Sequence, residues 1–156
     1  MKTEQAKIYY KAGNDFLKRR NYHKAIKSYL DAIKFDPNYI KAYSNLGVAY
    51  KNAGMFKLAE EIYLKALKIK PYSGVLYNNL GNVYTSMSMF HEAKELYKRA
   101  IKIYPKYKEA YYNLGQVYYF TGESEKALET RIILEKLKIS NPFKKPSNVL
   151  PIYQKK

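Results

Sequence analysis

A period of 34 residues runs through most of the chain and constrains the fold more than any other feature. It is plainest in three near-identical heptapeptides, SNLGVAY at 44–50, NNLGNVY at 78–84 and YNLGQVY at 112–118. Other residues recur at the same spacing: Pro37, Pro71 and Pro105; Ala25, Ala59, Ala93 and Ala127; Gly13, Gly47, Gly81 and Gly115. Such a period is typical of stacked supersecondary units, since one unit cannot bury its apolar face alone. The chain is therefore predicted to form a repeat array.

Within a period, the spacing of apolar residues predicts two helices. The first stripe, at the i, i+3, i+4 and i+7 positions of one helix face, consists of Tyr43, Leu46, Gly47 and Tyr50. A second stripe consists of Ala59, Tyr63 and Ala66, and it is ended by Pro71. Gly54 and Gly122 mark the turns between the two helices of their units.

The aromatic residues share the period. Three series hold ten of the 19 tyrosines: Tyr9, Tyr43, Tyr77 and Tyr111; Phe16, Tyr50, Tyr84 and Tyr118; Tyr29, Tyr63 and Tyr97. Because these positions fall on the apolar stripes, we expect core side chains there and no platform for stacking nucleic-acid bases.

This pattern resembles the tetratricopeptide repeat, in which an aromatic residue, Leu-Gly, Tyr, Ala, a second aromatic and Pro follow at fixed offsets. The resemblance covers residues 6 to about 139. It implies an all-α, right-handed solenoid of antiparallel helix pairs with a concave inner face. The expected repeats are about 6–39, 40–73, 74–107 and 108–140. They make a domain of residues 1–140, and residues 141–156 remain as a basic tail that contains proline.

In this family the first helix of each pair lines the concave groove, and the register implies which side chains face inward. The expected peptide-binding residues are Asn14, Asn45, Asn79, Asn82, Asn113, Gln116, Lys11, Lys41, Tyr112 and Tyr119. Asn45, Asn79 and Asn113 recur in step, and a carboxamide offers both a donor and an acceptor, as the backbone of an extended peptide does. A row of amides therefore suits peptide binding, while a second interpretation is that they only bridge neighbouring units.

A more specific function can be checked residue by residue. Some tetratricopeptide domains bind the C-terminal carboxylate of heat-shock chaperones, and they use an asparagine from each of the first two units. This chain matches those two residues with Asn14 and Asn45. The three cationic positions of those domains fall here on Tyr10, Val75 and Asn79. Because all three cations are absent, the sequence argues against a cochaperone that binds this carboxylate.

The net charge is +16 at pH 7, and it is graded along the chain. Residues 1–39 contain 9 basic and 4 acidic residues, whereas residues 108–140 contain 5 of each. The expected groove is basic at its N-terminal end and aromatic at its C-terminal end. We expect a scaffold or adaptor that binds a protein or peptide segment, with acidic residues favoured. The alternatives are an RNA-binding repeat protein, as the charge suggests, and a self-assembling scaffold that associates through its last helix or tail.

Several classes of function find no support in the sequence. The chain has no Cys, so a disulfide or a thiolate metal site is excluded. No phosphate-binding glycine loop or metal-ligand spacing occurs. We expect no enzyme and no cofactor. Because the sequence contains neither a membrane-helix stretch nor a signal peptide, we expect a cytoplasmic protein.

The last unit departs from the pattern. Arg131 stands where the second helix should have its aromatic residue. An insertion of three residues restores the register, with Leu134 in place of the aromatic and Leu137 in place of the later Ala. This predicts a final helix about one turn longer than its equivalents, ending near Ile139. The tail after this helix is expected to form no further helix. Three alternatives remain for it: an extended segment that covers the last helix, an extended segment that docks in another copy, or disorder.

Overall fold

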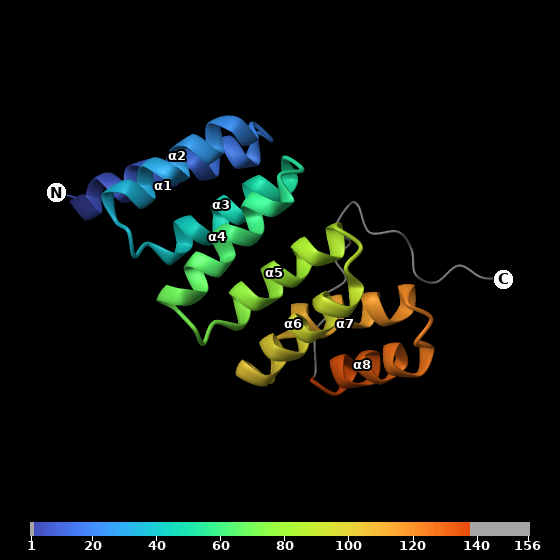
Figure 1. Ribbon diagram of the computed structural model, residues 1–156. Helices are drawn as coiled ribbons and strands as arrows, with labels where there is room; N and C mark the ends of the chain where they lie inside the picture. The colour runs from blue at the N-terminus through green and yellow to red at the C-terminus, as the bar shows by residue number, and fades with distance from the viewer. Residues whose placement is uncertain (1, 138–156) are drawn as a thin grey trace.

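The computed structural model describes residues 2–137, which form eight α-helices and contain no strand (Figure 1). The helices are α1 (Lys2–Lys18), α2 (Tyr22–Phe35), α3 (Ile40–Asn52), α4 (Phe56–Ile69), α5 (Gly74–Ser86), α6 (Phe90–Ile103), α7 (Lys108–Phe120) and α8 (Ser124–Lys136). Each predicted unit is one helix pair, and the pairs stack in chain order from the N-terminus to the C-terminus. The prediction of an all-α solenoid is confirmed. The expectations for the tail, residues 141–156, lie outside the described residues.

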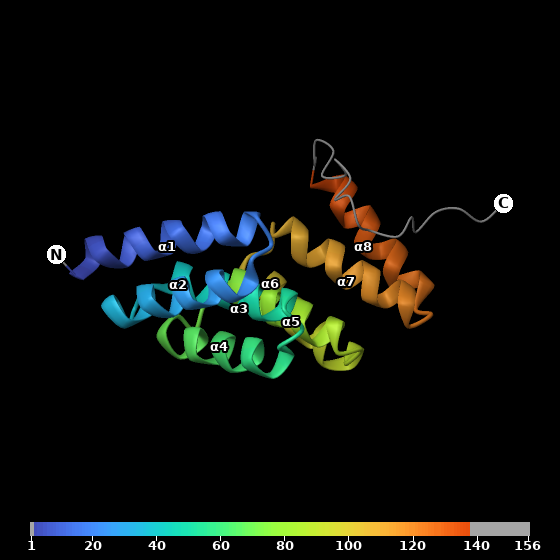
Figure 2. The same cartoon turned by 90° about the horizontal axis from the view of Figure 1, so that it is seen from above.

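The stack has an inner and an outer side. Each of the first helices α1, α3, α5 and α7 contacts the next of them, whereas no two of the second helices contact each other among the described residues. Consecutive pairs are therefore closer together on the side of the first helices. The view in Figure 2, turned by 90°, shows the same succession of pairs. The first helices form the concave face, which is where the family resemblance placed the groove.

Glycines bring the two helices of a pair close together. The rings of Tyr29, Tyr63 and Tyr97 are almost completely buried, and each lies on a glycine of the first helix in its own unit. A Cβ atom at Gly13 would lie 2.5 Å from Cε1 of Tyr29, and one at Gly81 would lie 2.6 Å from Cε1 of Tyr97. No side chain larger than glycine fits without displacing the ring. The predicted core role of this aromatic series is confirmed, and the other two series are buried or half-buried.

The turn between the helices of a pair requires a left-handed residue. Gly54 has φ +76° and Gly122 has φ +77°, as their sequence positions predict. The same position is occupied by Arg20 (φ 57°) in the first unit and by Ser88 (φ 60°) in the third. The turn geometry is thus common to all four units, although only two of them supply the residue that adopts it without strain.

The last helix does not follow the prediction. α8 ends at Lys136 and has 13 residues, whereas α2, α4 and α6 have 14 each, so the expected extra turn is wrong. Leu134 is buried, but Gly115 is covered by Thr130, whose Oγ1 would lie 2.6 Å from an added Cβ. Thr130 donates to the carbonyl of Ala127 at 2.7 Å. A small side chain that satisfies its own hydroxyl fills the space beside Gly115, so no inserted residues are needed.

Candidate functional site

The inner asparagines link the units to one another. Nδ2 of Asn45, on α3, donates to Oδ1 of Asn14 on α1 at 2.8 Å and to the Tyr10 hydroxyl at 3.2 Å. The same Asn14 oxygen accepts from the hydroxyl of Tyr29, on α2, at 2.8 Å. One carboxamide oxygen therefore joins three helices at the junction of the first and second units.

The junction of the third and fourth units repeats this arrangement 68 residues later. Nδ2 of Asn113 donates to Oδ1 of Asn82 at 3.0 Å and to Oδ1 of Asn78 at 2.9 Å. The Asn82 oxygen also accepts from the hydroxyl of Tyr97 at 2.7 Å. Asn78 is a buried polar side chain, and this bond satisfies its oxygen.

The middle junction differs because Val48 occupies the position of Asn14 and Asn82. Without a carboxamide there, Asn79 Nδ2 donates to Oγ of Ser44 at 3.2 Å, and the Tyr63 hydroxyl donates to the Ser44 carbonyl at 3.1 Å. The asparagines thus make the unit-bridging bonds that the second interpretation of the repeat expected.

In each of the three recurring asparagines, these bonds use the amide nitrogen and not the amide oxygen. Among the described residues, no hydrogen-bond donor reaches Oδ1 of Asn45, Asn79 or Asn113. Gln116 stands in the fourth unit where Asn14 and Asn82 stand in theirs, and its Nε2 is buried without an acceptor in the described part of the chain. The bridging bonds hold each recurring amide in one orientation and leave a row of oxygens as acceptors.

The first helices of the N-terminal half, α1 and α3, also have three of the lysines expected at the basic end of the groove. Lys11 and Lys41 are exposed and form no ion pair within residues 2–137. Lys51 is half-buried in the last turn of α3, and burial lowers its pKa because the charged form loses hydration. A nearby anion would stabilise this charge.

The C-terminal end of the row is aromatic. Tyr119 and Phe120 are 45% and 56% exposed, and their rings meet edge to face with centroids 6.0 Å apart. Tyr112 is half-buried on the same helix. The predicted residues thus all lie on first helices, with Lys11 and Lys41 on α1 and α3 and the aromatic residues on α7.

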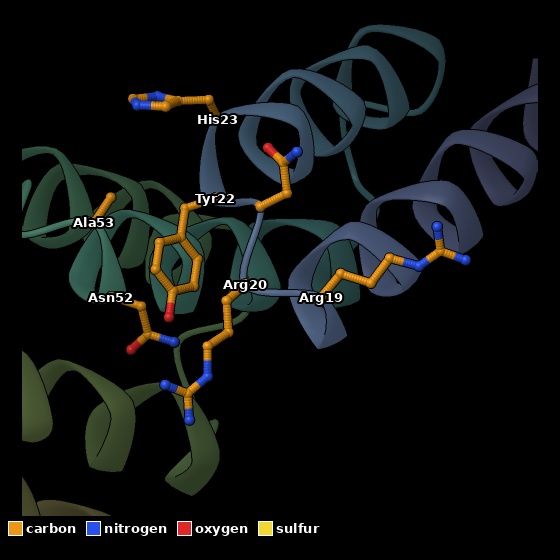
Figure 3. A pocket seen from close by; sticks show the side chains of 7 residues that line it. Arg19, Arg20, Tyr22, His23, Asn52 and Ala53 are labelled. Carbon is orange, nitrogen blue, oxygen red and sulfur yellow. The ribbon is translucent and has the colours of Figure 1, made fainter.

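The sequence prediction placed Asn14 and Asn82 in the groove, but it did not identify them, Tyr10, Ser44 or Asn78 as acceptors of the asparagine bonds. Tyr10, Ser44 and Asn78 lie 35 residues before their donors, whereas Asn14 and Asn82 lie 31 residues before theirs. With a period of 34 residues, the offset of 35 is one residue more than a period, and the offset of 31 is about one helical turn less. A search at 31 and 35 residues would have found them. Sequence reasoning also missed a pocket at the first turn, lined by Arg19, Arg20 and Tyr22 among others (Figure 3).

Two further features bear on the class of site. Within residues 2–137, no group of three or more His, Cys, Asp or Glu side chains could hold a metal ion. The helices described for these residues are all too short or too polar to cross a membrane.

The fold and the inner face define a helical-repeat solenoid. A tetratricopeptide repeat model matches residues 41–106 and 72–130, and a second TPR repeat model matches residues 13–54. The chain belongs to the tetratricopeptide repeat family, a protein-interaction fold.

Similarity to individual proteins is more limited. Hsp70-Hsp90 organizing protein 1 of Arabidopsis thaliana is 52% identical over 42 residues, which are 27% of this chain and 7% of that protein. MamA has a solved structure that is 30% identical with a TM-score of 0.72, covering 86% of this chain and 74% of that one. The first TPR of Spaghetti (RPAP3), solved with the HSP90 peptide SRMEEVD bound, is 23% identical with a TM-score of 0.71, covering 77% and 95%. That last similarity concerns the fold alone.

Proposed function

We propose that the chain is an adaptor that binds an extended, acidic peptide segment of another protein along its concave face. The observation that carries this proposal is the row of asparagine oxygens on successive first helices, each fixed by a bond to the preceding unit. Fixed acceptors lose little conformational freedom when a ligand binds, and this favours affinity.

Peptide N–H groups would donate to Oδ1 of Asn45, Asn79 and Asn113. Backbone contacts of this kind place little demand on the peptide sequence, so selectivity must come from the flanking side chains. Lys11, Lys41 and the desolvated Lys51 favour carboxylates at the N-terminal end. Tyr119 and Phe120 offer exposed apolar surface for a large side chain at the other end.

The chaperone relatives suggest one acidic peptide, the C-terminal tail of a heat-shock chaperone. The side chains here do not favour that ligand. Where such a clamp needs cations, this chain has Tyr10, Val75 and Asn79; Tyr10 and Asn79 take part in the unit-bridging bonds. We therefore propose an internal acidic segment as the ligand.

Charge reversal at the groove tests the proposal. Peptides selected by display on the wild-type chain are measured by fluorescence anisotropy against the variant Lys11→Glu/Lys41→Glu. The matched control is Lys27→Glu/Lys57→Glu, which makes the same change of charge at exposed residues of the second helices α2 and α4. We expect the groove variant to bind about tenfold or more weakly, and the control within about twofold of wild type.

Equal loss of affinity in both variants would mean that net charge, rather than the groove, attracts the peptide. Full retention in the groove variant would exclude this face as the site. Titrating the wild type with single-stranded RNA in increasing salt examines the nucleic-acid alternative, since displacement of counterions from several phosphates makes binding fall steeply with salt.

A further inference from the structure

The turn between α1 and α2 forms an open pocket against the end of α3, which we call the turn pocket. It is lined by Arg19, Arg20, Tyr22, His23 and Asn52, among others (Figure 3). Figure 3 shows the side chains of Arg20, Tyr22 and Asn52 pointing toward the same space, with Arg19 and His23 extending away on either side. The pocket thus presents a guanidinium, a phenol hydroxyl and a carboxamide together.

The positive charge of the turn pocket is uncompensated. No acidic side chain lines it, and neither Arg19 nor Arg20 forms an ion pair within the described chain. The other two arginines are engaged. Arg99 lies 5.3 Å from the centroid of the Tyr77 ring, and Nε of Arg131 lies 3.3 Å from Glu135.

Arginines in the turn between the two helices of a pair occur in the first unit alone. Arg20 has the left-handed backbone that glycine adopts at the equivalent Gly54 and Gly122, so the chain keeps a long side chain where its backbone is strained. The equivalent turns contain no arginine or lysine between the two helices; their sequences are AGM at 53–55, MSM at 87–89 and TGE at 121–123. Helix pairing therefore does not require a cation at this position.

We propose that the turn pocket binds the phosphoryl group of a phosphorylated side chain in the protein partner. The planar guanidinium of Arg20 matches two phosphate oxygens at once, and Tyr22 and Asn52 supply neutral donors. A single basic turn suits a single phosphate. An RNA backbone needs a row of cations, and the next turns along this edge lack them.

The proposal deepens the proposed function, because Asn52 ends α3, one of the helices of the concave face. A peptide that reaches this end of the groove would place a phosphorylated residue in the turn pocket.

The test uses O-phospho-L-serine and L-serine as probes, followed by backbone amide NMR of the full chain. We expect saturable shifts at residues 20–23 and 52 with O-phospho-L-serine and none with L-serine. Arg20→Gln is expected to weaken binding about tenfold or more, since a charge-assisted hydrogen bond is lost. Tyr22→Phe, which keeps the ring, is expected to weaken it by a smaller factor. Lys57→Gln removes the same charge elsewhere and is expected to change nothing.

Equal weakening by Arg20→Gln and Lys57→Gln, or shifts spread over the lysines of the second helices, would overturn the proposal. So would binding of a uridine oligonucleotide at residues 20–23 without binding of O-phospho-L-serine. The free amino acid has no peptide chain to lie in the groove, so this result is independent of the Lys11→Glu/Lys41→Glu experiment. Each proposal can fail while the other stands.

Discussion

Two asparagine oxygens organise the inner face at the scale of single residues. Oδ1 of Asn14 and Oδ1 of Asn82 each accept from a tyrosine of their own unit and from an asparagine of the next. An oxygen with two lone pairs is satisfied by two donors. Loss of Asn14 would take the acceptor from the hydroxyl of the buried Tyr29, which is more unfavourable than the bond alone suggests, whereas the Tyr97 hydroxyl would keep its contact with Oγ1 of Thr85 at 2.9 Å.

The three recurring asparagines should therefore differ in their effect on stability. Asn45→Ala and Asn113→Ala each remove two hydrogen bonds and are expected to destabilise by about 1–2 kcal/mol, whereas Asn79→Ala removes one and should cost about 1 kcal/mol or less. Equilibrium urea denaturation measures the difference. Asn52→Ala, at an exposed helix end, is the control and should stay within about 0.5 kcal/mol of wild type. Equal effects for all four substitutions would contradict the bonding pattern.

At the scale of the helix pair, the sequence predicts the helices and contacts within one unit. It does not predict the hydrogen bonds between neighbouring units. The period of 34 residues locates both helices, and Gly13 and Tyr29 identify their contact because both residue types recur. Hydrogen bonds across a junction join residues 31 or 35 apart, and this offset follows from how the units stack. The same limit applies to α8, where Thr130 rather than Leu134 lies against Gly115.

The strained turns give a prediction for the helix pair. Ser88→Gly is expected to stabilise by roughly 0.5–1 kcal/mol, because Ser88 has φ 60° and glycine adopts this conformation freely. Ser86→Gly is the matched control. It makes the same change two residues earlier, at the last residue of α5, where it also removes the hydrogen bond from Ser86 Oγ to the Asn82 carbonyl at 2.9 Å, and it should destabilise by up to about 1 kcal/mol. Thermal and urea melts of the two variants should move in opposite directions; a shift in the same direction would mean that the turn is not strained.

At the scale of the whole molecule, a fully buried tyrosine in each of the first three units makes the stability of the fold depend on pH. Burial raises the pKa of Tyr29 and of Tyr97 to about 12, and burial also raises the pKa of Tyr63. In the unfolded chain a tyrosine titrates near 10. The folded state therefore retains protons that the unfolded state releases, so this contribution to stability is complete below pH 10 and is lost as the pH rises from about 10 toward 12.

Alkaline unfolding should accordingly be cooperative and linked to these tyrosines. Absorbance of tyrosinate and far-ultraviolet circular dichroism are recorded together between pH 9 and 13. We expect part of the tyrosinate signal to rise only as the helical signal is lost. In Tyr97→Phe one linked proton is absent, so its stability relative to neutral pH should fall less steeply. Complete tyrosine ionisation with the helices intact would contradict the burial of these rings.

The amide pattern also determines how the stack can deform. Within residues 2–137, an asparagine with two hydrogen bonds links the units on the concave side of each outer junction, whereas the middle junction has the single bond from Asn79 to Ser44 there. On the side of α4, the Tyr84 hydroxyl donates to Glu60 and holds the middle junction together. Because the middle junction has fewer of these bonds, we expect the stack to bend more readily between α4 and α5 than at the other two junctions. A peptide bound in the proposed groove would then be held in a fixed shape at the two ends and would find more room to adjust at the centre.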